Sequence, residues 1–272
     1  MTFTALLLKE VRDSLRNKWL ILYAAAFAIL GLTFSYYGYL GLNLVGFRAF
    51  GRVSAALINM ALYMIPLMAM TLAGLSIVGE REKGVLEILL AQPISKSQVI
   101  LSKFLGISIS ITLATMLGYG IAAWYLWIFL SSADLYVYLM ILGACALLAA
   151  SLTAFGLLIS VVSRSRFEAL GIILIAWLVL ILLYEFIIIG LTLTFRIDVN
   201  GLFMALTLNP VESARILMIS FIDPTLLILG PEGVKLSQVI KGLHPYIMVG
   251  SLITWTIISL AASTWIFGSQ DL

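Results

Sequence analysis

The sequence predicts an all-α, polytopic membrane protein, and three observations lead to that prediction. Of the 272 residues, 62% are hydrophobic and only 11% are charged, whereas a soluble domain typically carries about 25% charged residues. The apolar residues gather in windows of about 20 residues or more, which is the length that an α-helix needs to cross a bilayer. The charged residues fall mainly between these windows. We therefore expect one transmembrane domain with six spans, at roughly residues 19–40, 56–78, 104–130, 137–162, 168–194 and 246–267.

The first 18 residues are expected to form a separate amphipathic helix that lies in the membrane interface. Apolar side chains recur at every fourth position from Phe3 to Trp19, and the basic residues Lys9, Arg12 and Arg16 occupy another face. A helix of this kind buries its apolar side at the headgroup level and keeps its bases near anionic lipid. The alternative is that residues 3–18 extend the first span into the cytoplasm.

Two features inside the expected spans are candidate sites. Met60, Met64 and Met68 recur at helical spacing in the second span, and thioethers can bind Cu(I). We favour packing as their role, because methionine also fills gaps between helices and no Cys or His lies beside the stripe in the sequence. Glu185 is an ionisable residue toward the outer end of the fifth span. It is a candidate for gating or cargo contact; alternatively it faces outer water or pairs with Arg196.

A short charged segment, residues 79–103, separates the second and third spans. It opens with four charges of alternating sign, Glu80, Arg81, Glu82 and Lys83. This is not the polybasic pattern that binds lipid headgroups. Because most of the chain is apolar, this segment is one of the few places where the protein can present a structured charged surface to water. We interpret it as the place where a partner drives the protein; the alternative is a solvated loop whose charges only fix topology.

Within this segment the sequence predicts a helix, a turn and a second helix. Gly84 interrupts the charged run. A short apolar helix follows, formed by Val85, Leu86, Ile88, Leu89 and Leu90 with Glu87 on its polar side. Pro93 ends that helix, because proline lacks an N–H and clashes with the preceding turn. Ser95 and Gln98 have the spacing of a capping box that starts the next helix. The whole element is compact enough to enter a groove on a partner.

The loop between the fifth and sixth spans, residues 195–245, is expected to carry a short helix at the outer surface. Asn209 and Pro210 form a helix-start signal, and apolar residues then recur at helical spacing. Glu212 and Arg215 have the i,i+3 spacing of an ion pair. The alternative is a seventh span near residues 202–229, which the polar and charged residues in that stretch make expensive.

The distribution of Lys and Arg predicts that both termini are cytoplasmic. An even number of spans places them on one side, and that side holds the larger share of basic residues. These are Lys9, Arg12, Arg16, Lys18, Arg81, Lys83, Lys96, Lys103, Arg164 and Arg166.

Composition also excludes several classes of function. The net charge of +3 is scattered, which gives nucleic-acid binding no support. Cys145 is the single cysteine and His244 the single histidine, so the sequence predicts no internal disulfide and no resident metal site of Cys or His. Gly79 and Gly84 have the spacing of a phosphate-binding loop, but the Lys-Ser/Thr that must follow is missing. We expect no nucleotide cofactor and no enzymatic activity in this chain.

The charged segment resembles the signature loop of type-2 ABC transporter permeases. The residues that carry the likeness are Glu80, Gly84, Leu86, Glu87, Leu89, Leu90 and Pro93. Residues 9–18 are similar to the family's N-terminal interface helix, and the six spans also match. The resemblance implies a coupling helix that docks on a cytoplasmic ATPase, with Lys9, Arg12 and Arg16 beside it. It further implies a homodimer in the cytoplasmic membrane that binds two ATPase copies, which carry the ATP and Mg.

Within the family the chain resembles the permeases that serve maturation of nitrous oxide reductase, a copper enzyme. The likeness lies in residues 78–84, in the stretch from Pro93 to Phe104, and in Asn209, Pro210 and Glu212. It implies that the outer loop, including Arg215, faces a β-helical, NosD-like periplasmic protein. Two alternatives stay open: a generic type-2 exporter of lipid, glycan or drug, and a membrane scaffold unrelated to ABC transporters.

Overall fold

The computed structural model describes residues 3–45, 48–127, 132–194, 199–226 and 244–270, and every regular element in these residues is helical. The predicted fold class is therefore confirmed. The elements are α1 (Phe3–Leu15), α2 (Lys18–Val45), α3 (Arg48–Gly74), α4 (Ser76–Glu82), α5 (Val85–Leu90), α6 (Lys96–Trp127), α7 (Ser132–Val162), α8 (Arg166–Leu178), the π-helix η1 (Val179–Leu183), α9 (Tyr184–Thr194), α10 (Val199–Leu208), α11 (Pro210–Ile222) and α13 (His244–Ser269).

Each of the six predicted spans, as far as its residues are described, falls on a helix or on a near-continuous run of helices; residues 128–130 of the third lie outside the described residues. Five helical stretches in the described residues are long and apolar enough to cross a membrane: Ser54–Glu82, Lys96–Ile121, Tyr136–Val162, Arg166–Gly190 and Pro245–Ser269. Two bent pairs, α1 with α2 and α10 with α11, bring the total to seven if each pair is one span. The second span continues beyond its predicted end, because α4 extends it to Glu82.

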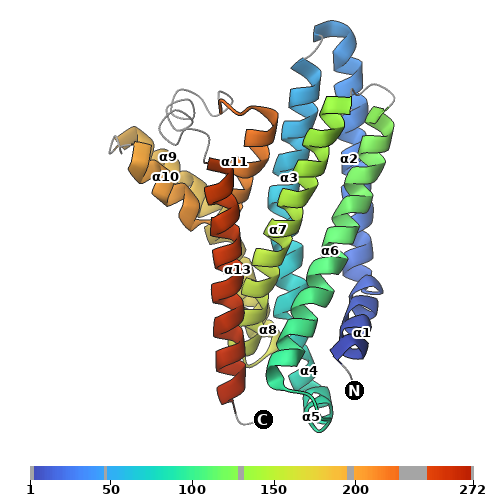
Figure 1. Cartoon of the computed structure of the whole chain (residues 1–272), viewed down its shortest axis with the longest axis vertical. Helices are drawn as coiled ribbons and strands as arrows, with labels where there is room; N and C mark the ends of the chain where they lie inside the picture. Colours follow the sequence, from blue (N-terminus) through green and yellow to red (C-terminus); the bar gives the residue numbers. More distant parts are fainter. Residues whose placement is uncertain (1–2, 46–47, 128–131, 195–198, 227–243, 271–272) are drawn as a thin grey trace.

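The long helices form an elongated bundle. In Figure 1, α2, α3, α6 and α7 run side by side along the longest axis, and α13 packs against α7. The described chain begins and ends at the end of the bundle that carries α4 and α5. Near the other end, α9, α10 and α11 lie to one side of the bundle axis. The arrangement places the charged segment and both ends of the chain together, as the prediction of two cytoplasmic termini requires.

Two glycines allow close contacts between helices. A Cβ at Gly156 of α7 would lie 2.9 Å from the Cα of Met70, and a Cβ at Gly106 of α6 would lie 3.1 Å from the carbonyl carbon of Glu10. Small residues let helix backbones approach in membranes, where packing drives association. Gly156 therefore sets the contact between α7 and α3, and Gly106 sets the contact between α6 and α1.

The methionine stripe belongs to the packed interior. Met60 is buried in the hydrophobic core, and Met64 and Met68 are partly buried against it. These contacts support packing as the role of the stripe.

Candidate functional site

The predicted helix, turn and helix are present in the charged segment. α4 ends at Glu82, and Gly84 joins it to α5 with φ at +68°, in the left-handed region that L side chains rarely adopt. α5 ends at Leu90, ahead of Pro93. The capping box is confirmed: the Gln98 N–H donates to Ser95 Oγ at 3.3 Å, and the Ser95 N–H donates to Gln98 Oε1 at 3.1 Å.

The short helix α5 has two faces. Leu86 and Leu89 are buried and anchor the helix to the protein, whereas the side chains of Ile88 and Val85 are 69% and 42% exposed. Glu87 is exposed on the same outward side. We call Val85, Glu87 and Ile88 the outer face of α5. The sequence prediction treated all the residues of the segment as one contact surface, but the structure divides them into anchors and an outer face.

Behind α5, a buried lysine joins three helices. The Nζ of Lys103 on α6 lies 2.7 Å from Glu80 Oε1 on α4 and 3.2 Å from Glu10 Oε2 on α1. The Lys103 side chain is only 2% exposed, and that of Glu10 is 7% exposed. Removing one member of such a group leaves an uncompensated buried charge, which costs several kcal/mol. The Lys103 triad therefore fixes the positions of α1, α4 and α6 relative to one another.

The next two charges of the segment are also engaged within the chain. Arg81 donates to the Ser163 carbonyl at 3.1 Å and to Gln270 Oε1 at 2.7 Å. Glu82 Oε2 lies 3.1 Å from Arg166 Nε at the start of α8. These contacts attach the segment to the ends of α7, α8 and α13. Because the charged groups of Glu80, Arg81 and Glu82 are paired within the chain, they are less available to a partner protein. Lys83, in contrast, is exposed.

The N-terminal helix is separate from the first span. α1 and α2 meet at an angle of 59°, so α1 is not a straight extension of α2. Arg12 and Arg16 are exposed, and Lys9 lies 3.5 Å from Glu10 Oε1. The face that packs inward carries Leu6 and Glu10 rather than the predicted apolar stripe. Sequence reasoning missed Glu10; its spacing of four residues from Leu6 is the signal that places both on one face.

At the other end of the molecule, Asn209 separates α10 from α11, which meet at an angle of 113°. Its Oδ1 accepts a hydrogen bond from the Val211 N–H at 2.9 Å, which confirms the predicted helix start. Its Nδ2 donates to the Leu180 carbonyl in the π-helix at 2.6 Å. The alternative of a seventh span near residues 202–229 stays open in a bent form, because α10 and α11 are together long and apolar enough to make one broken span.

The predicted helix over residues 210–221 exists as α11, but most of it is buried within the chain. It packs against α7 and α13, and Asn209, Pro210 and Glu212 are among its buried residues. The physical reason is that the apolar residues of α11 recur on the side that meets the bundle. The predicted partner-facing residues are therefore mostly interior in the single chain.

Three charged residues cluster where α9 meets α11: Glu185 of α9, and Glu212 and Arg215 of α11. Arg215 lies 2.9 Å from Glu185 Oε1 and 3.5 Å from Glu212 Oε1, so the predicted i,i+3 pair is present. The pairing alternative for Glu185 named Arg196, which lies outside the described residues. In the described part of the chain, Glu185 instead pairs with the arginine of α11. One guanidinium thus holds two carboxylates, and the cluster joins α9 to α11.

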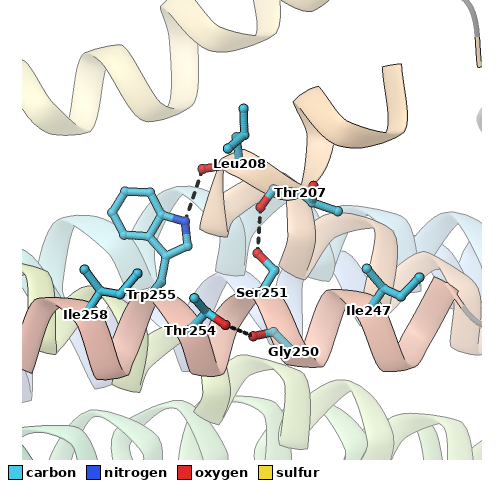
Figure 2. A pocket seen from close by; sticks show the side chains of 8 residues that line it. All are labelled: Thr207, Leu208, Ile247, Gly250, Ser251, Thr254, Trp255 and Ile258. Carbon is cyan, nitrogen blue, oxygen red and sulfur yellow. Dashed lines mark hydrogen bonds between the residues drawn. The ribbon is translucent and has the colours of Figure 1, made fainter. Parts of the chain in front are cut away.

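Side chains of α13 satisfy the last carbonyls of α10. Figure 2 shows Ser251 Oγ donating to the Thr207 carbonyl at 2.7 Å and Trp255 Nε1 donating to the Leu208 carbonyl at 3.1 Å. A largely apolar cavity of about 610 Å³ lies between these helices. Free carbonyls are costly in a membrane. These bonds therefore allow the chain to turn sharply at Asn209.

The sequence is similar to a known protein family and to named proteins of two bacteria. A family model described as "ABC-2 family transporter protein" matches residues 4–272. A protein of Pseudomonas aeruginosa named "Probable ABC transporter permease protein NosY" is 29% identical over 221 residues, which cover 79% of this chain and 80% of that protein. A protein of Stutzerimonas stutzeri with the same name is 29% identical over 218 residues, which cover 78% and 79% respectively.

Proposed function

The chain belongs to the ABC-2 family of transporter proteins and is a permease subunit rather than an enzyme, and we propose that a partner ATPase drives it through the outer face of α5. ATP and Mg would bind the partner, because this sequence has no phosphate-binding loop of its own. Residues 1–272 would then act as a single transmembrane domain without a cofactor.

The observation that carries this proposal is the exposure of Ile88. A side chain that is 69% exposed and apolar, next to exposed Glu87 and Val85, suits insertion into a groove on another protein. The opposite face of the helix is anchored by Leu86 and Leu89. A force applied to the outer face would therefore move α5 together with the helices beneath it.

The contacts of the charged segment supply a route for that force. The Lys103 triad links α4 to α1 and α6, and Arg81 links α4 to the ends of α7 and α13. α4 follows directly on the span α3. Displacement of α5 would in this way reach several spans at their cytoplasmic ends. Lys9, Arg12 and Arg16 lie on the helix beside this segment, where the same partner can contact the exposed arginines.

We propose that the functional unit is a homodimer in the cytoplasmic membrane that binds two ATPase copies. The chain is a multi-pass membrane protein, and both of its ends would be cytoplasmic because they lie beside α4 and α5. In the single chain, α8 carries exposed apolar side chains such as Phe167 and Ile175, which are 89% and 67% exposed. Family membership supports pairing of two permeases, and this side of the protein offers apolar area to a second copy or to lipid.

For the biological process, we propose maturation of nitrous oxide reductase during denitrification. The support is that two relatives, each similar over about four fifths of the chain, are named NosY permeases. On the outer side, the loop that contains α10 and α11 would face a β-helical periplasmic protein. Because Asn209 and Glu212 are interior, they would shape this contact, while Glu185 and Arg215 would connect it to α9 and the spans. An exporter of lipid, glycan or drug is the competing function.

The docking proposal is tested by purifying the permease together with its ATPase from membranes. Ile88→Glu puts a charge in the centre of the outer face of α5 and should reduce the ATPase retained at least tenfold. Ser97→Glu is the matched control, because it adds the same charge at an exposed position that belongs to α6 and not to the outer face of α5. Equal retention by the two variants would refute docking through α5.

A further inference from the structure

A cavity of about 520 Å³ opens beside the Lys103 triad, and the coupling proposal does not use it. It lies between α1, the junction of α3 and α4, α6 and α8. One part of its wall is polar and carries Glu10, Asp13, Glu80 and Lys103. The rest is apolar and is formed mainly by Leu67, Met68, Leu72, Leu75, Ile107 and Leu170. A cavity with one charged side and one apolar side fits an amphiphile rather than a soluble metabolite.

The charged side of the cavity favours a positive ligand. Glu10, Asp13 and Glu80 contribute three carboxylates to the wall, and Lys103 contributes one ammonium that is already shared between Glu10 and Glu80. Lys9, which lies 3.5 Å from Glu10 Oε1, is the other cation in an ion pair with this group, so carboxylates outnumber cations among the lining residues and their ion-pair partners. The Oε2 atom of Glu80 is buried and has no hydrogen-bond partner among the described residues.

An aromatic ring completes the polar end. Trp19, at the start of α2, lines the cavity with a side chain that is 67% exposed. Ammonium groups bind over the faces of tryptophan rings, and neighbouring carboxylates add to that attraction. Ser14 and Asn17 line the same region and offer hydrogen-bond donors.

We propose that this cavity binds one membrane lipid whose headgroup ends in an ammonium group. The ammonium would donate to Glu80 Oε2 and lie near Trp19, the phosphate would accept hydrogen bonds from Ser14 and Asn17, and an acyl chain would follow the wall that includes Leu72 and Ile107. A lipid with an uncharged or anionic headgroup end would leave the carboxylates unpaired. The lipid would contact the Lys103 triad directly, so its presence would stabilise the arrangement of α1, α4 and α6.

The test uses the full chain, extracted from membranes that contain phosphatidylethanolamine and phosphatidylglycerol and examined by native mass spectrometry without nucleotide. We expect phosphatidylethanolamine to be enriched on the protein relative to the membrane. Asp13→Asn should lower its retention about two- to fivefold, the range that one exposed ion pair supports. Leu72→Trp should lower retention by filling the cavity. Glu168→Gln is the control, since it removes an exposed carboxylate outside the cavity and should leave lipid retention unchanged.

Three results would overturn the proposal: equal retention of the two lipids, no effect of either cavity variant, or a dimer that retains no lipid because a second copy fills the cavity. If Leu72→Trp does not fold, Asp13→Asn still decides, because Asp13 is exposed and tolerates substitution. ATPase docking is measured separately, so failure of lipid binding would leave the proposed function intact.

Discussion

The Nζ of Lys103 lies 2.7 Å from Glu80 Oε1, although the two residues belong to different helices and the lysine side chain is almost completely buried. Glu10 Oε2 of α1 lies 3.2 Å from the same ammonium. Because one buried charge holds three helices, the end of the permease that carries α4 and α5 should respond as a unit when α5 is displaced.

Replacing Lys103 tests this connection. Lys103→Met leaves Glu10 and Glu80 without their shared cation and should destabilise the protein by about 3 kcal/mol. Thermal unfolding of the detergent-solubilised protein measures the effect. Lys83→Met removes a lysine that is exposed and should change the stability by less than about 0.5 kcal/mol. Equal effects of the two substitutions would show that the triad does not hold the helices together.

Gly84→Ala tests whether the turn before α5 depends on backbone conformation. The positive φ of Gly84 costs an L side chain about 1–2 kcal/mol, and nothing lies within 4 Å of the added Cβ, so strain is the only expected penalty. Gly143→Ala is the matched control, because its Cβ also meets open space and the residue lies inside helix α7. The control should be neutral or slightly stabilising, and thermal unfolding distinguishes the two.

Asn209 should be sensitive to loss of either of its two hydrogen bonds. Asn209→Ala removes the cap of α11 and the donor to Leu180, with an expected cost of about 2 kcal/mol. Asn209→Asp keeps the capping oxygen but loses that donor and buries a charge, so it should be no more stable than Asn209→Ala. An aspartate variant as stable as the native protein would contradict the role assigned to the Leu180 bond.

The cluster at Arg215 predicts unequal effects of neutralising its members. Arg215→Gln leaves Glu185 and Glu212 without their shared cation, and should strongly destabilise the end of the protein that carries α9 and α11. Glu212→Gln leaves the Arg215–Glu185 pair in place, so it should be tolerated better. Comparing thermal unfolding of the two variants checks this order, and the reverse order would contradict the assigned pairing.

Local features of this fold could be predicted from the sequence, because they depend on residues close together in the chain. The capping box of Ser95 and Gln98, the helix start at Asn209, and the ion pair of Glu212 and Arg215 all follow from fixed short spacings. The long apolar windows likewise predict the spans, because a bilayer requires helices of that length.

Contacts between distant helices could not be predicted in the same way. Lys103 pairs with Glu10 across 93 positions, and Arg81 bonds to Gln270 across 189 positions. A single sequence contains no periodicity that joins such residues. For this reason the charged segment was predicted as one contact surface, whereas the structure uses Glu80, Arg81 and Glu82 to hold the helices and leaves the outer face of α5 exposed.

The most direct test of the central claim is photo-cross-linking from the outer face of α5. A photoreactive phenylalanine analogue at position 88 should cross-link to the partner ATPase in native membranes. The same analogue at position 97, at the start of α6, should give at most a weak product. Strong cross-links from position 88, together with loss of ATPase binding in the Ile88→Glu variant, would support docking through α5. An ATPase that co-purifies with the permease but never cross-links from position 88 would contradict it.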